Sequence, residues 1–369
     1  MEALMSTKAN LSALVSTAGL LLAVAVHAGP YDALVFHHAP VHYQDTDSSD
    51  YPSDYVTAFD YDSDRIATNN WDNRTGGLWP ATVYYSVVES CSHYFISYAF
   101  FHPRDWSDTI FDQEHENDLE GALLAVRKNG STFGQLEAMV TVFHTNFFSF
   151  TPAGSPLTNG HESIDGTVSF EAHNGVNRPK TVQEAKGHGI KAWPYTSDFN
   201  GSANQDGIIY YPSQGAAEYP SSGNDRFVAY RLVDIHAANG MWAAALNDAN
   251  LPSGSAQTFH TWGTFKGDTS GGCGAGLKSC SSNSANTPWG WDDGDDAASY
   301  RGEFALDPAN LIDHYFDGVG TFSHQYFNNS YLQTLRAAGY TGDHLPSGFP
   351  SQLNLDQLYS KLTTVCPSM

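Results

Sequence analysis

Two apolar segments with a short charged motif between them constrain the fold of this chain more than any other feature. Residues 94–101 are apolar or aromatic on both alternating faces, and residues 119–126 are apolar apart from Glu120 and Gly121. A segment that is apolar on both faces is typical of an inner β-strand. Residues 81–89 have a similar composition, so residues 81–101 predict a β-hairpin with its turn at residues 89–92. Pro103 is expected to end the second strand, because proline cannot donate to the ladder.

The segment 119–126 fits a helix or a strand by periodicity alone. Gly121 and the turn signal at residues 128–130 favour a strand. On a strand, Asp118 and Glu120 project to one face, because side chains alternate. His115 has the opposite parity, so we expect it to reach the same place from the preceding loop. On a helix the three side chains would not converge, so a shared ligand requires the strand.

The rest of the chain indicates a mainly β fold. Further strands are expected at residues 138–150, 167–173, 208–211, 227–233 and 302–306, separated by turns rich in Gly, Pro, Ser and Asn. Short helices are expected at residues 243–246, 331–338 and 355–362, the last capped by Asn354 and Gln357. No linker or repeat divides the chain. We therefore predict an all-β or mainly β protein, a jelly-roll-like β-sandwich with long loops and a few short peripheral helices, in which residues 29–369 form a single domain.

Residues 1–28 are typical of a secretory signal peptide. An apolar run follows Lys8, and residues 26–28 form a small-residue cleavage pattern that ends at Ala28. No later stretch is long and apolar enough for a transmembrane segment. We therefore expect the mature protein to be secreted into the extracellular space.

The four cysteines of an exported chain predict two disulfides, for which three connectivities exist. Cys273 and Cys280 bracket a Gly-rich loop and are expected to pair locally. Cys91 and Cys366 would then join the C-terminal segment to the aromatic hairpin. No Cys-x-x-Cys motif indicates a thiol metal site or a redox centre.

The chain is strongly acidic, with 40 acidic and 17 basic side chains and a formal net charge of −23. This balance excludes nucleic acid as a partner, because affinity for phosphates comes from Lys and Arg. It also disfavours simple electrostatic adhesion to an anionic membrane. It favours cations as partners, although solubility alone is an alternative reason for such a charge.

The charged motif His115-x-x-Asp118-x-Glu120, with Asp105 ten residues before His115, carries the most specific chemistry of the sequence. A zinc-protease motif is excluded, because its second histidine would fall on Leu119. Hard divalent cations take carboxylate oxygens and tolerate an imidazole. The motif therefore predicts a site for one divalent cation, Ca²⁺ or Mg²⁺, with Mn²⁺ as a third option. The alternative is a solvated acidic loop beside a buried strand.

This arrangement resembles that of the necrosis- and ethylene-inducing-like proteins and the related vacuolar-sorting-like β-sandwich families. In those families an aromatic strand ends in a Pro-basic-Asp turn, here residues 103–105, and a loop then leads to His-x-x-Asp-x-Glu. Residues 187–189 and 288–290 resemble the Gly-His element and the closing Pro-Trp-Gly of these families. The second histidine and the tryptophan of the necrosis-inducing heptapeptide are replaced by Asn117 and Leu119.

The resemblance implies a β-sandwich that holds one calcium or magnesium ion by four residues, Asp105, His115, Asp118 and Glu120. It also implies that His188 lies near the same pocket. In the necrosis-inducing members, this site supports binding of plant sphingolipid sugar headgroups and membrane damage.

Our leading hypothesis is a secreted, cation-binding β-sandwich protein that recognises a glycan or lipid headgroup, as the necrosis-inducing cytolysins do, which leaves peripheral membrane contact open. Trp106, Tyr98 and Trp193 are the candidates for a surface on which sugar rings stack. The alternative is a secreted metal-dependent hydrolase of an extracellular ester, phosphodiester or glycan, in which the ion lowers the pKa of bound water. His188 or Glu116 would then act as the general base. A third hypothesis is a purely structural ion.

Overall fold

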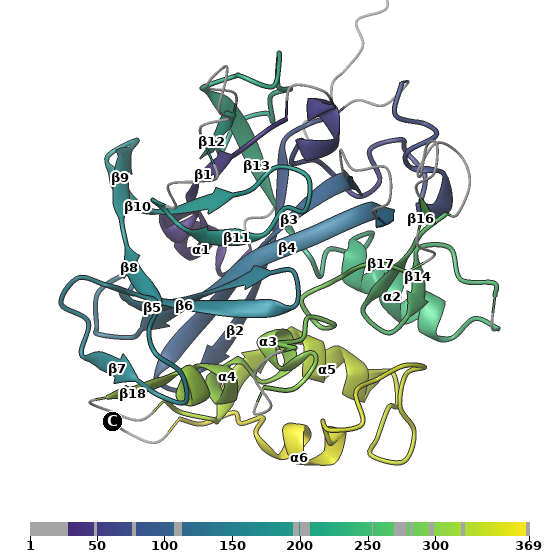
Figure 1. Cartoon of the computed structure of the whole chain (residues 1–369). Helices are drawn as coiled ribbons and strands as arrows, with labels where there is room; N and C mark the ends of the chain where they lie inside the picture. Colours follow the sequence, from purple (N-terminus) through teal and green to yellow (C-terminus); the bar gives the residue numbers. More distant parts are fainter. Residues whose placement is uncertain are drawn as a thin grey trace, which may run out of the picture.

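The computed structural model describes residues 29–47, 50–75, 79–106, 113–194, 199, 207–252, 254–268, 279–280, 283–294, 299–318 and 322–366. One large sheet dominates this part of the chain, with the strand order β11-β10-β1-β12-β13-β2-β3-β4-β5-β6-β8 (Figure 1). In chain order these strands are β1 (Val41–Gln44), β2 (Thr82–Ser90), β3 (His93–Asp105), β4 (Gln113–Arg127), β5 (Gln135–Phe143), β6 (Asn146–Pro152), β8 (Gly166–Val168), β10 (Val176–Gln183), β11 (Ile190–Ala192), β12 (Ile208–Pro212) and β13 (Val228–Asp234). Three further strands pair at its sides: β9 (Phe170–His173), β16 (Ser279–Cys280) and β19 (Tyr326–Asn329).

The large sheet curls so that its two halves face each other. Strands β2 to β6 are antiparallel neighbours, whereas β13 joins β2 in parallel. The terminal strand β11 folds back to contact β4, β5 and β8. Between the two halves lies one apolar core, in which Tyr98 and Phe100 of β3 meet Tyr210 of β12 and Tyr230 of β13. The mainly β, sandwich-like architecture predicted from the sequence is therefore confirmed.

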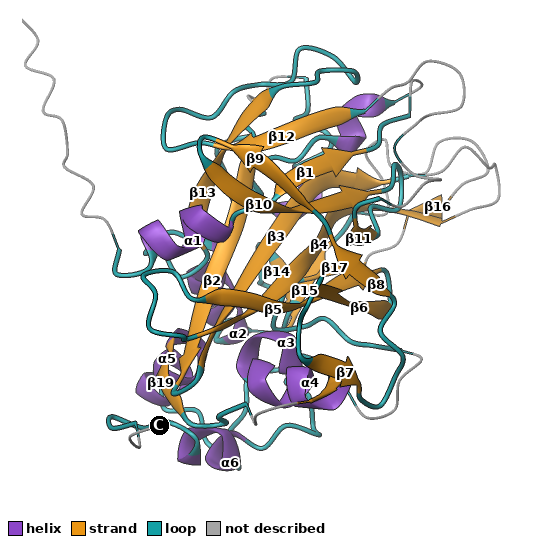
Figure 2. Cartoon of the chain, turned by 90° about the vertical axis from the view of Figure 1, so that its left-hand side faces the viewer, coloured by secondary structure: helices purple, strands orange, loops and turns teal. Residues whose placement is uncertain are grey.

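Five helices cover the outer face of strands β2 to β5 (Figures 1 and 2). They are α2 (Met241–Ala249), α3 (Glu303–Leu306), α4 (Pro308–Tyr315), α5 (Ser330–Ala337) and α6 (Leu355–Ser360). Each contributes apolar side chains to a second core, as Leu332 of α5 and Leu355 of α6 do. Burial of such a side chain contributes about 1.5–3 kcal/mol. Helix α1 (Asp32–His38) instead packs its Leu34 and Val35 into the core between the two halves of the sheet.

Several smaller elements complete the described part of the chain. They are two 3₁₀ helices, η1 (Tyr51–Asp54) and η2 (Ala67–Asn69), the three-stranded sheet β14 (Phe259–Thr261), β15 (Thr264–Lys266) and β17 (Asn283–Asn286), and the pair β7 (Leu157–Asn159) and β18 (Phe316–Gly318). The sheet of β14, β15 and β17 is relevant to the functional site described below, because β17 lies beside β4.

Most predicted elements are present, but some predicted segments differ. Residues 167–173 are divided between β8 and β9 instead of forming one strand. Residues 138–150 form parts of β5 and β6 instead of one strand, because the chain turns at His144, which has a left-handed backbone. Residues 302–306 were predicted as a strand, which is wrong. Gly302 has a left-handed backbone (φ 83°) and precedes α3. Asn354 caps α6 as expected and accepts hydrogen bonds from two backbone N–H groups of its first turn.

The prediction that Pro103 ends its strand is also wrong, because β3 continues to Asp105. His102 pairs with Asp118 and Arg104 pairs with Glu116, so the register is the same on both sides of Pro103. The ladder omits only the pair between Pro103 and Asn117. A proline without an N–H group is tolerated where the ladder makes no pair.

Cys91 and Cys366 form a disulfide, as predicted, which joins the turn between β2 and β3 to the C-terminal segment. Such a bond is consistent with an oxidising compartment. Cys273, the side chain of its expected partner Cys280 and the expected signal peptide at residues 1–28 lie outside the described residues.

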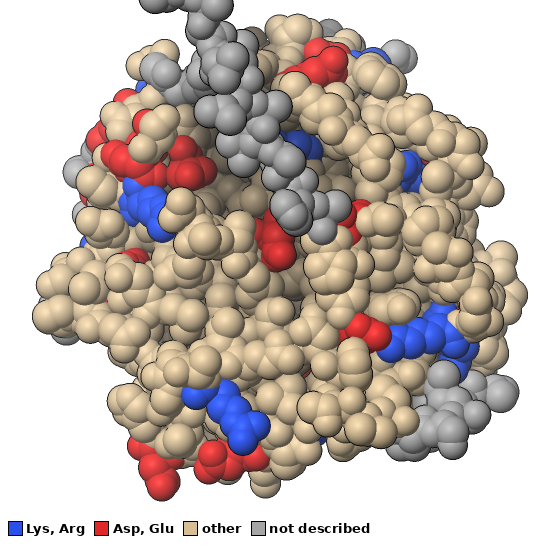
Figure 3. Space-filling model, turned by 180° about the vertical axis from the view of Figure 1, so that it is seen from behind, with Lys and Arg blue, Asp and Glu red and all other residues tan. Residues whose placement is uncertain are grey.

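No described helix is long and apolar enough to cross a lipid bilayer. On the face seen in Figure 3, acidic side chains are distributed in small groups among uncharged residues. The large negative charge of the chain is therefore not gathered into a single patch on this face.

Candidate functional site

A polar pocket of about 280 Å³ lies where β3 ends and β4 begins. All four residues that the sequence suggests as metal ligands line it: Asp105, His115, Asp118 and Glu120. Its other walls come from the β5–β6 turn, from Gly187 and from residues 285–292, including Trp291 and Asp292. The fold therefore brings the four predicted ligands to one pocket, Asp105 from β3 and the other three from β4.

His115 reaches this pocket from within β4, not from a preceding loop as expected. The reason is Asn117, whose left-handed backbone (φ 62°) interrupts the alternation of side chains between His115 and Asp118. Asparagine tolerates this conformation better than most residues. The Asn117 side chain is held in place, because its Nδ2 donates to the carbonyl oxygens of Ala67 (2.8 Å) and Lys266 (3.0 Å). Across the ladder, His115 Nε2 lies 3.5 Å from Asp105 Oδ2.

Asp118 is held from behind by His188. The His188 Nδ1 atom lies 2.8 Å from Asp118 Oδ2, and its Nε2 lies 3.2 Å from Asp54 Oδ1. The imidazole is fully buried and stacks on the ring of His102 at a centroid distance of 3.9 Å. Asp54 Oδ1 also accepts hydrogen bonds from Trp106 Nε1 (2.9 Å) and the Lys186 N–H (2.9 Å). His188 is therefore fixed between two carboxylates.

This contact makes His188 a buried cation. Burial alone would lower its pKa, but the hydrogen bonds and charges of Asp118 and Asp54 outweigh burial and raise the pKa of His188 to about 10. Burial likewise tends to raise the pKa of Asp118, but the His188 hydrogen bond and charge lower it overall. At neutral pH the group is therefore an ion triad, Asp54–His188–Asp118.

The remaining carboxylates of the pocket lack a comparable partner. Burial, followed by the negative charge of Asp118, raises the pKa of Glu120 well above its usual value. Glu120 Oε1 accepts the backbone N–H of His144 (2.7 Å), whereas Glu120 Oε2 is buried with no hydrogen-bond partner among the described residues. Burial also raises the pKa of Asp105 to about 6, against the opposing charge of His115. Carboxylates that lie this close together would be stabilised by a positively charged partner.

The residues present fit a hard divalent cation in donor type and charge. Carboxylate oxygens are the preferred ligands of Ca²⁺ and Mg²⁺, and Glu120 Oε2 is a buried acceptor still available to such an ion. Within the described ranges, however, no three His, Cys, Asp or Glu side chains converge closely enough to hold a metal ion by themselves. An ion in this pocket would therefore keep water ligands, as Mg²⁺ commonly does in proteins.

The three residues suggested as a sugar-stacking surface do not line this pocket. Tyr98 is fully buried in the core between the sheet halves, where its hydroxyl donates to the Val35 carbonyl oxygen (2.7 Å). Trp106 is buried beside Asp54. Trp193 is partly exposed but stacks on Tyr43 of β1, outside the pocket. The aromatic side chain that does line the pocket is Trp291.

Glu116, the second candidate for a general base, points elsewhere. Its carboxylate accepts the backbone N–H groups of Trp71 (3.1 Å) and Asp268 (3.0 Å). It therefore connects the loop at residues 60–75 to β4 and is absent from the pocket wall.

Sequence reasoning missed two residues of this site, Asp54 and His144. Asp54 lies in η1, far from the motif in sequence, within an acidic N-terminal region that offers no distinguishing signal. His144 Nε2 contacts Glu184 Oε1 at 2.8 Å and its backbone contacts Glu120. No sequence signal indicated His144, because residues 138–150 were predicted as one strand without a turn.

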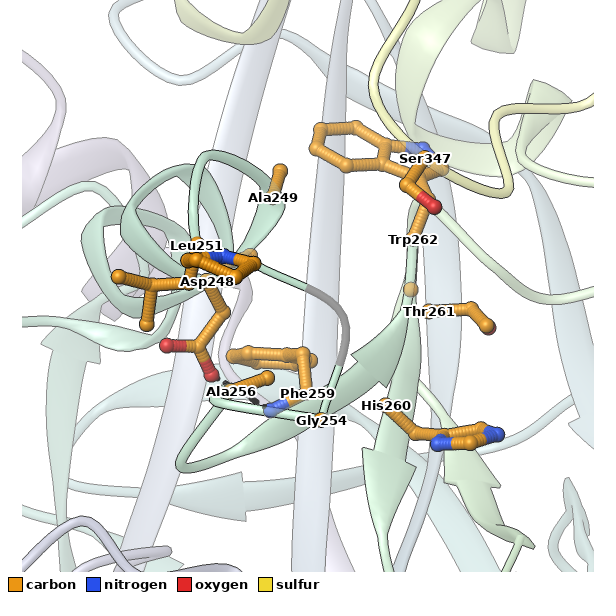
Figure 4. Close-up of a pocket in the computed structure, with 13 residues that line it drawn as sticks. Asp248, Ala249, Leu251, Gly254, Ala256, Phe259, His260, Thr261, Trp262 and Ser347 are labelled. Atoms are coloured by element: carbon orange, nitrogen blue, oxygen red, sulfur yellow. Dashed lines mark hydrogen bonds between the residues drawn. The ribbon is translucent and has the colours of Figure 1, made fainter.

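A second pocket, of about 250 Å³, lies between α2 and the β14–β15 hairpin (Figure 4). Its one carboxylate belongs to Asp248, whose Oδ2 accepts the backbone N–H groups of Gln257, Thr258 and Phe259 at 2.7–3.2 Å. The charge of Asp248 is thus used to hold the loop before β14. The one carboxylate of this pocket serves the fold, so the pocket at β3 and β4 is the better functional candidate.

No family model matches this chain, and no curated protein matches it in sequence. Solved structures of toxin-fold proteins align with it at low similarity. The complex titled "NLPPya in complex with mannosamine" aligns over 79% of this chain and 92% of its own, with 13% identity and a TM-score of 0.34. Necrosis and Ethylene inducing Protein 2 from the causal agent of cocoa's Witches Broom disease aligns over 60% of this chain and 80% of its own, with 14% identity and a TM-score of 0.30.

A third alignment, titled "Toxin fold for microbial attack and plant defense", covers 61% of this chain and 82% of its own, with 12% identity and a TM-score of 0.30. Structural neighbours of this chain are thus necrosis- and ethylene-inducing proteins, at low identity. Because similarity at this level carries no function from one chain to another, the function must be argued from the pocket itself.

Proposed function

We propose that the pocket at the end of β3 binds one divalent cation, Ca²⁺ or Mg²⁺, and through it recognises an oxygen-rich ligand, a glycan or lipid headgroup, outside the cell. Asp105, His115, Asp118 and Glu120 would hold the ion together with water ligands, since no three such side chains converge on one point among the described residues. When bound, the ion supplies positive charge that attracts ligand hydroxyls or phosphates. The observation that carries the proposal is Glu120 Oε2, a buried carboxylate oxygen with no hydrogen-bond partner among the described residues.

The electrostatics of the pocket support a cation. A buried, unpaired carboxylate is costly, and proteins compensate it with a metal or with a proton. Here the proton is the alternative, since burial and Asp118 raise the pKa of Glu120. A bound cation would displace that proton, so metal affinity is expected to increase with pH.

The shape and walls of the pocket support a small polar ligand. Its volume of about 280 Å³ and the polar side chains of Asn286, Asp292 and Thr145 suit a single sugar ring or headgroup. Two of the aligned structures are complexes, one with mannosamine and one with glucosamine. These amino sugars are therefore suitable first probes.

The geometry of His188 disfavours the hydrolase alternative. A general base needs a free lone pair within reach of the attacking water. Both ring nitrogens of His188 contact carboxylates, and the ring is fully buried. His188 is therefore a positioning residue, which orients Asp118 as the partners of metal ligands commonly do.

The proposal is tested by calorimetric titration of the purified protein with CaCl₂ and MgCl₂ after exhaustive chelation. We expect one ion per chain for the wild type and at least tenfold weaker binding for Glu120→Gln, which keeps an acceptor for the His144 N–H. Asp118→Asn should abolish binding. Asp343→Asn, a substitution of an exposed aspartate, is the matched control and should bind like the wild type.

Ligand recognition is then measured on a glycan and lipid-headgroup array, with metal and with chelator. Binding that disappears both on chelation and in Glu120→Gln supports the whole proposal. If the protein binds metal but gives no signal on the array, the ion has a structural role and the proposed ligand recognition is wrong. If wild type and Glu120→Gln bind metal equally well, the proposed metal site is wrong.

A further inference from the structure

A row of buried polar side chains leads from β1 and β10 to His188, the partner of Asp118. Its centre is Gln183, the last residue of β10, which is fully buried. Gln183 Oε1 accepts hydrogen bonds from the Nε2 atoms of His42 (2.9 Å) and His102 (3.0 Å). Gln183 Nε2 donates to the carbonyl oxygen of His188 (2.5 Å). One carboxamide therefore connects β1, β3 and the turn that carries His188.

The direction of each hydrogen bond in this row follows from the groups present. The carbonyl oxygen of His188 needs a donor, so the nitrogen of the Gln183 amide faces it and Oε1 faces the two imidazoles. Burial lowers the pKa of His42 to about 3, so its ring is neutral and carries one N–H group. That group is on Nε2, which leaves His42 Nδ1 to accept the Thr181 hydroxyl (2.9 Å). Every polar atom of the Gln183 side chain is therefore in use.

The backbone of His188 depends on this support. His188 has φ 58°, a left-handed conformation that is uncommon for residues other than glycine. The turn around it is closed by the Glu184 N–H, which donates to the Gly189 carbonyl oxygen (3.1 Å). The His188 carbonyl oxygen lies inside this turn, and a buried carbonyl without a donor is costly. By donating to it, Gln183 holds the His188 backbone in the conformation that brings the ring to Asp118.

Gln183 also acts on the plane of the His188 ring, through His102. The two imidazoles stack almost parallel, with ring centroids 3.9 Å apart and an angle of 6° between their planes. In this plane the His188 ring directs Nδ1 to Asp118 Oδ2 and Nε2 to Asp54 Oδ1. Because the hydrogen bond from His102 Nε2 to Gln183 fixes the lower ring of the stack, the backbone and the ring of His188 both depend on one residue.

We propose that Gln183 is a positioning residue of the metal site, which acts through His188 on the direction of the Asp118 carboxylate. This inference rests on the proposed function, because it takes Asp118 as a metal ligand. Gln183 is absent from the pocket wall, so it contacts neither the ion nor a ligand. Without its amide the His188 carbonyl loses its donor and the His102 ring loses its anchor. The His188 ring is then free to turn, and Asp118 loses the partner that fixes its Oδ2 atom.

Gln44 provides the matched control. It is fully buried, and it pairs with Gln183 across the β1–β10 ladder. Its Nε2 donates to the carbonyl oxygens of Asp45 (2.8 Å) and Glu184 (3.1 Å), and not to that of His188. Gln183→Met and Gln44→Met each remove one buried carboxamide at neighbouring positions, so both should lower the melting temperature. Only Gln183→Met should disturb the metal site.

The first measurement is made on the chelated, metal-free protein. Both ring N–H groups of His188 are buried and bonded to carboxylates, so they should exchange slowly and give resolved proton signals in histidine-labelled protein. Asp118→Asn assigns these signals by shifting them. We expect Gln183→Met to shift or abolish them and Gln44→Met to leave them unchanged. Gln183→Asn, whose amide is too short to reach both imidazoles and the His188 carbonyl, is the milder second variant and should shift them less.

The second measurement is calorimetric titration with CaCl₂ and MgCl₂. Residues that orient metal ligands commonly change affinity by a factor of about ten or more, so we expect about tenfold weaker binding for Gln183→Met and wild-type affinity for Gln44→Met. If Gln183→Met leaves the His188 signals unchanged, or if Gln44→Met alters signals and affinity equally, the positioning role is wrong. A wild type that binds no metal contradicts the proposed function instead, and the ring signals of the metal-free protein still decide whether Gln183 positions His188.

Discussion

Replacing Asp54 by asparagine is the most direct probe of the buried ion triad Asp54–His188–Asp118. The folded-state pKa of His188 is about 10, whereas an unfolded histidine titrates near 6.5. Each pKa unit corresponds to about 1.4 kcal/mol, so protonation of His188 contributes on the order of 5 kcal/mol below pH 6.5. Because Asp54 and Asp118 share this effect, we expect Asp54→Asn to lower the free energy of unfolding by about 2–4 kcal/mol at pH 6.

The sign of the pH dependence follows from the raised pKa. Between about pH 6.5 and pH 10 the folded protein binds a proton that the unfolded chain does not, so this contribution to stability decreases as pH rises. The difference between wild type and Asp54→Asn should therefore be largest at pH 6 and small near pH 10. Urea unfolding at four pH values, with Asp343→Asn as the exposed control, measures it. A difference that stays constant from pH 6 to pH 9.5 would show that His188 carries no charge in the folded protein.

Two further predictions concern stability. Burial raises the pKa of Glu303 to about 7, and the side chain is 1% exposed. The folded state therefore holds a proton that the unfolded chain has lost, so the contribution of Glu303 to stability should decrease from pH 4.5 to pH 7, and the stability of the wild type relative to Glu303→Gln should decrease over this range in urea unfolding. A profile of equal slope would contradict the assignment. The disulfide between Cys91 and Cys366 spans 275 residues, so its removal by serine at both positions should cost about 3–5 kcal/mol, measured by calorimetric unfolding under non-reducing conditions. Unchanged stability would mean that the unfolded chain is already restricted without the bond.

Local pattern was sufficient to predict the central strands. Residues 94–101 and 119–126 are apolar on both faces, and the sheet indeed buries both faces of β3 and β4. The same reasoning failed at Pro103 and at residues 302–306, where a single backbone conformation decides the outcome. At Pro103 the ladder makes no pair with Asn117, whose backbone is left-handed, and Gly302 precedes a helix instead of a strand. Such conformations depend on tertiary contacts that no local pattern records.

The site was predictable to the extent that its residues are close in sequence. The positions of Asp118 and Glu120 follow from strand alternation, and the structure places both in one pocket. The contribution of Asp54 was not predictable, because it reaches His188 from a part of the chain 134 residues away. The stacking role suggested for Tyr98 depended on proximity in sequence alone, whereas its side chain is buried in the core between the two halves of the sheet.

The Cys91–Cys366 bond also decides how this molecule responds to mechanical load. Tension applied at the C-terminus is carried both by the backbone before Cys366 and by the disulfide to Cys91, in the turn that joins β2 to β3. Helix α6 lies within the covalent loop that this bond closes. The tail therefore stays attached to the central strands even when α6 unfolds locally.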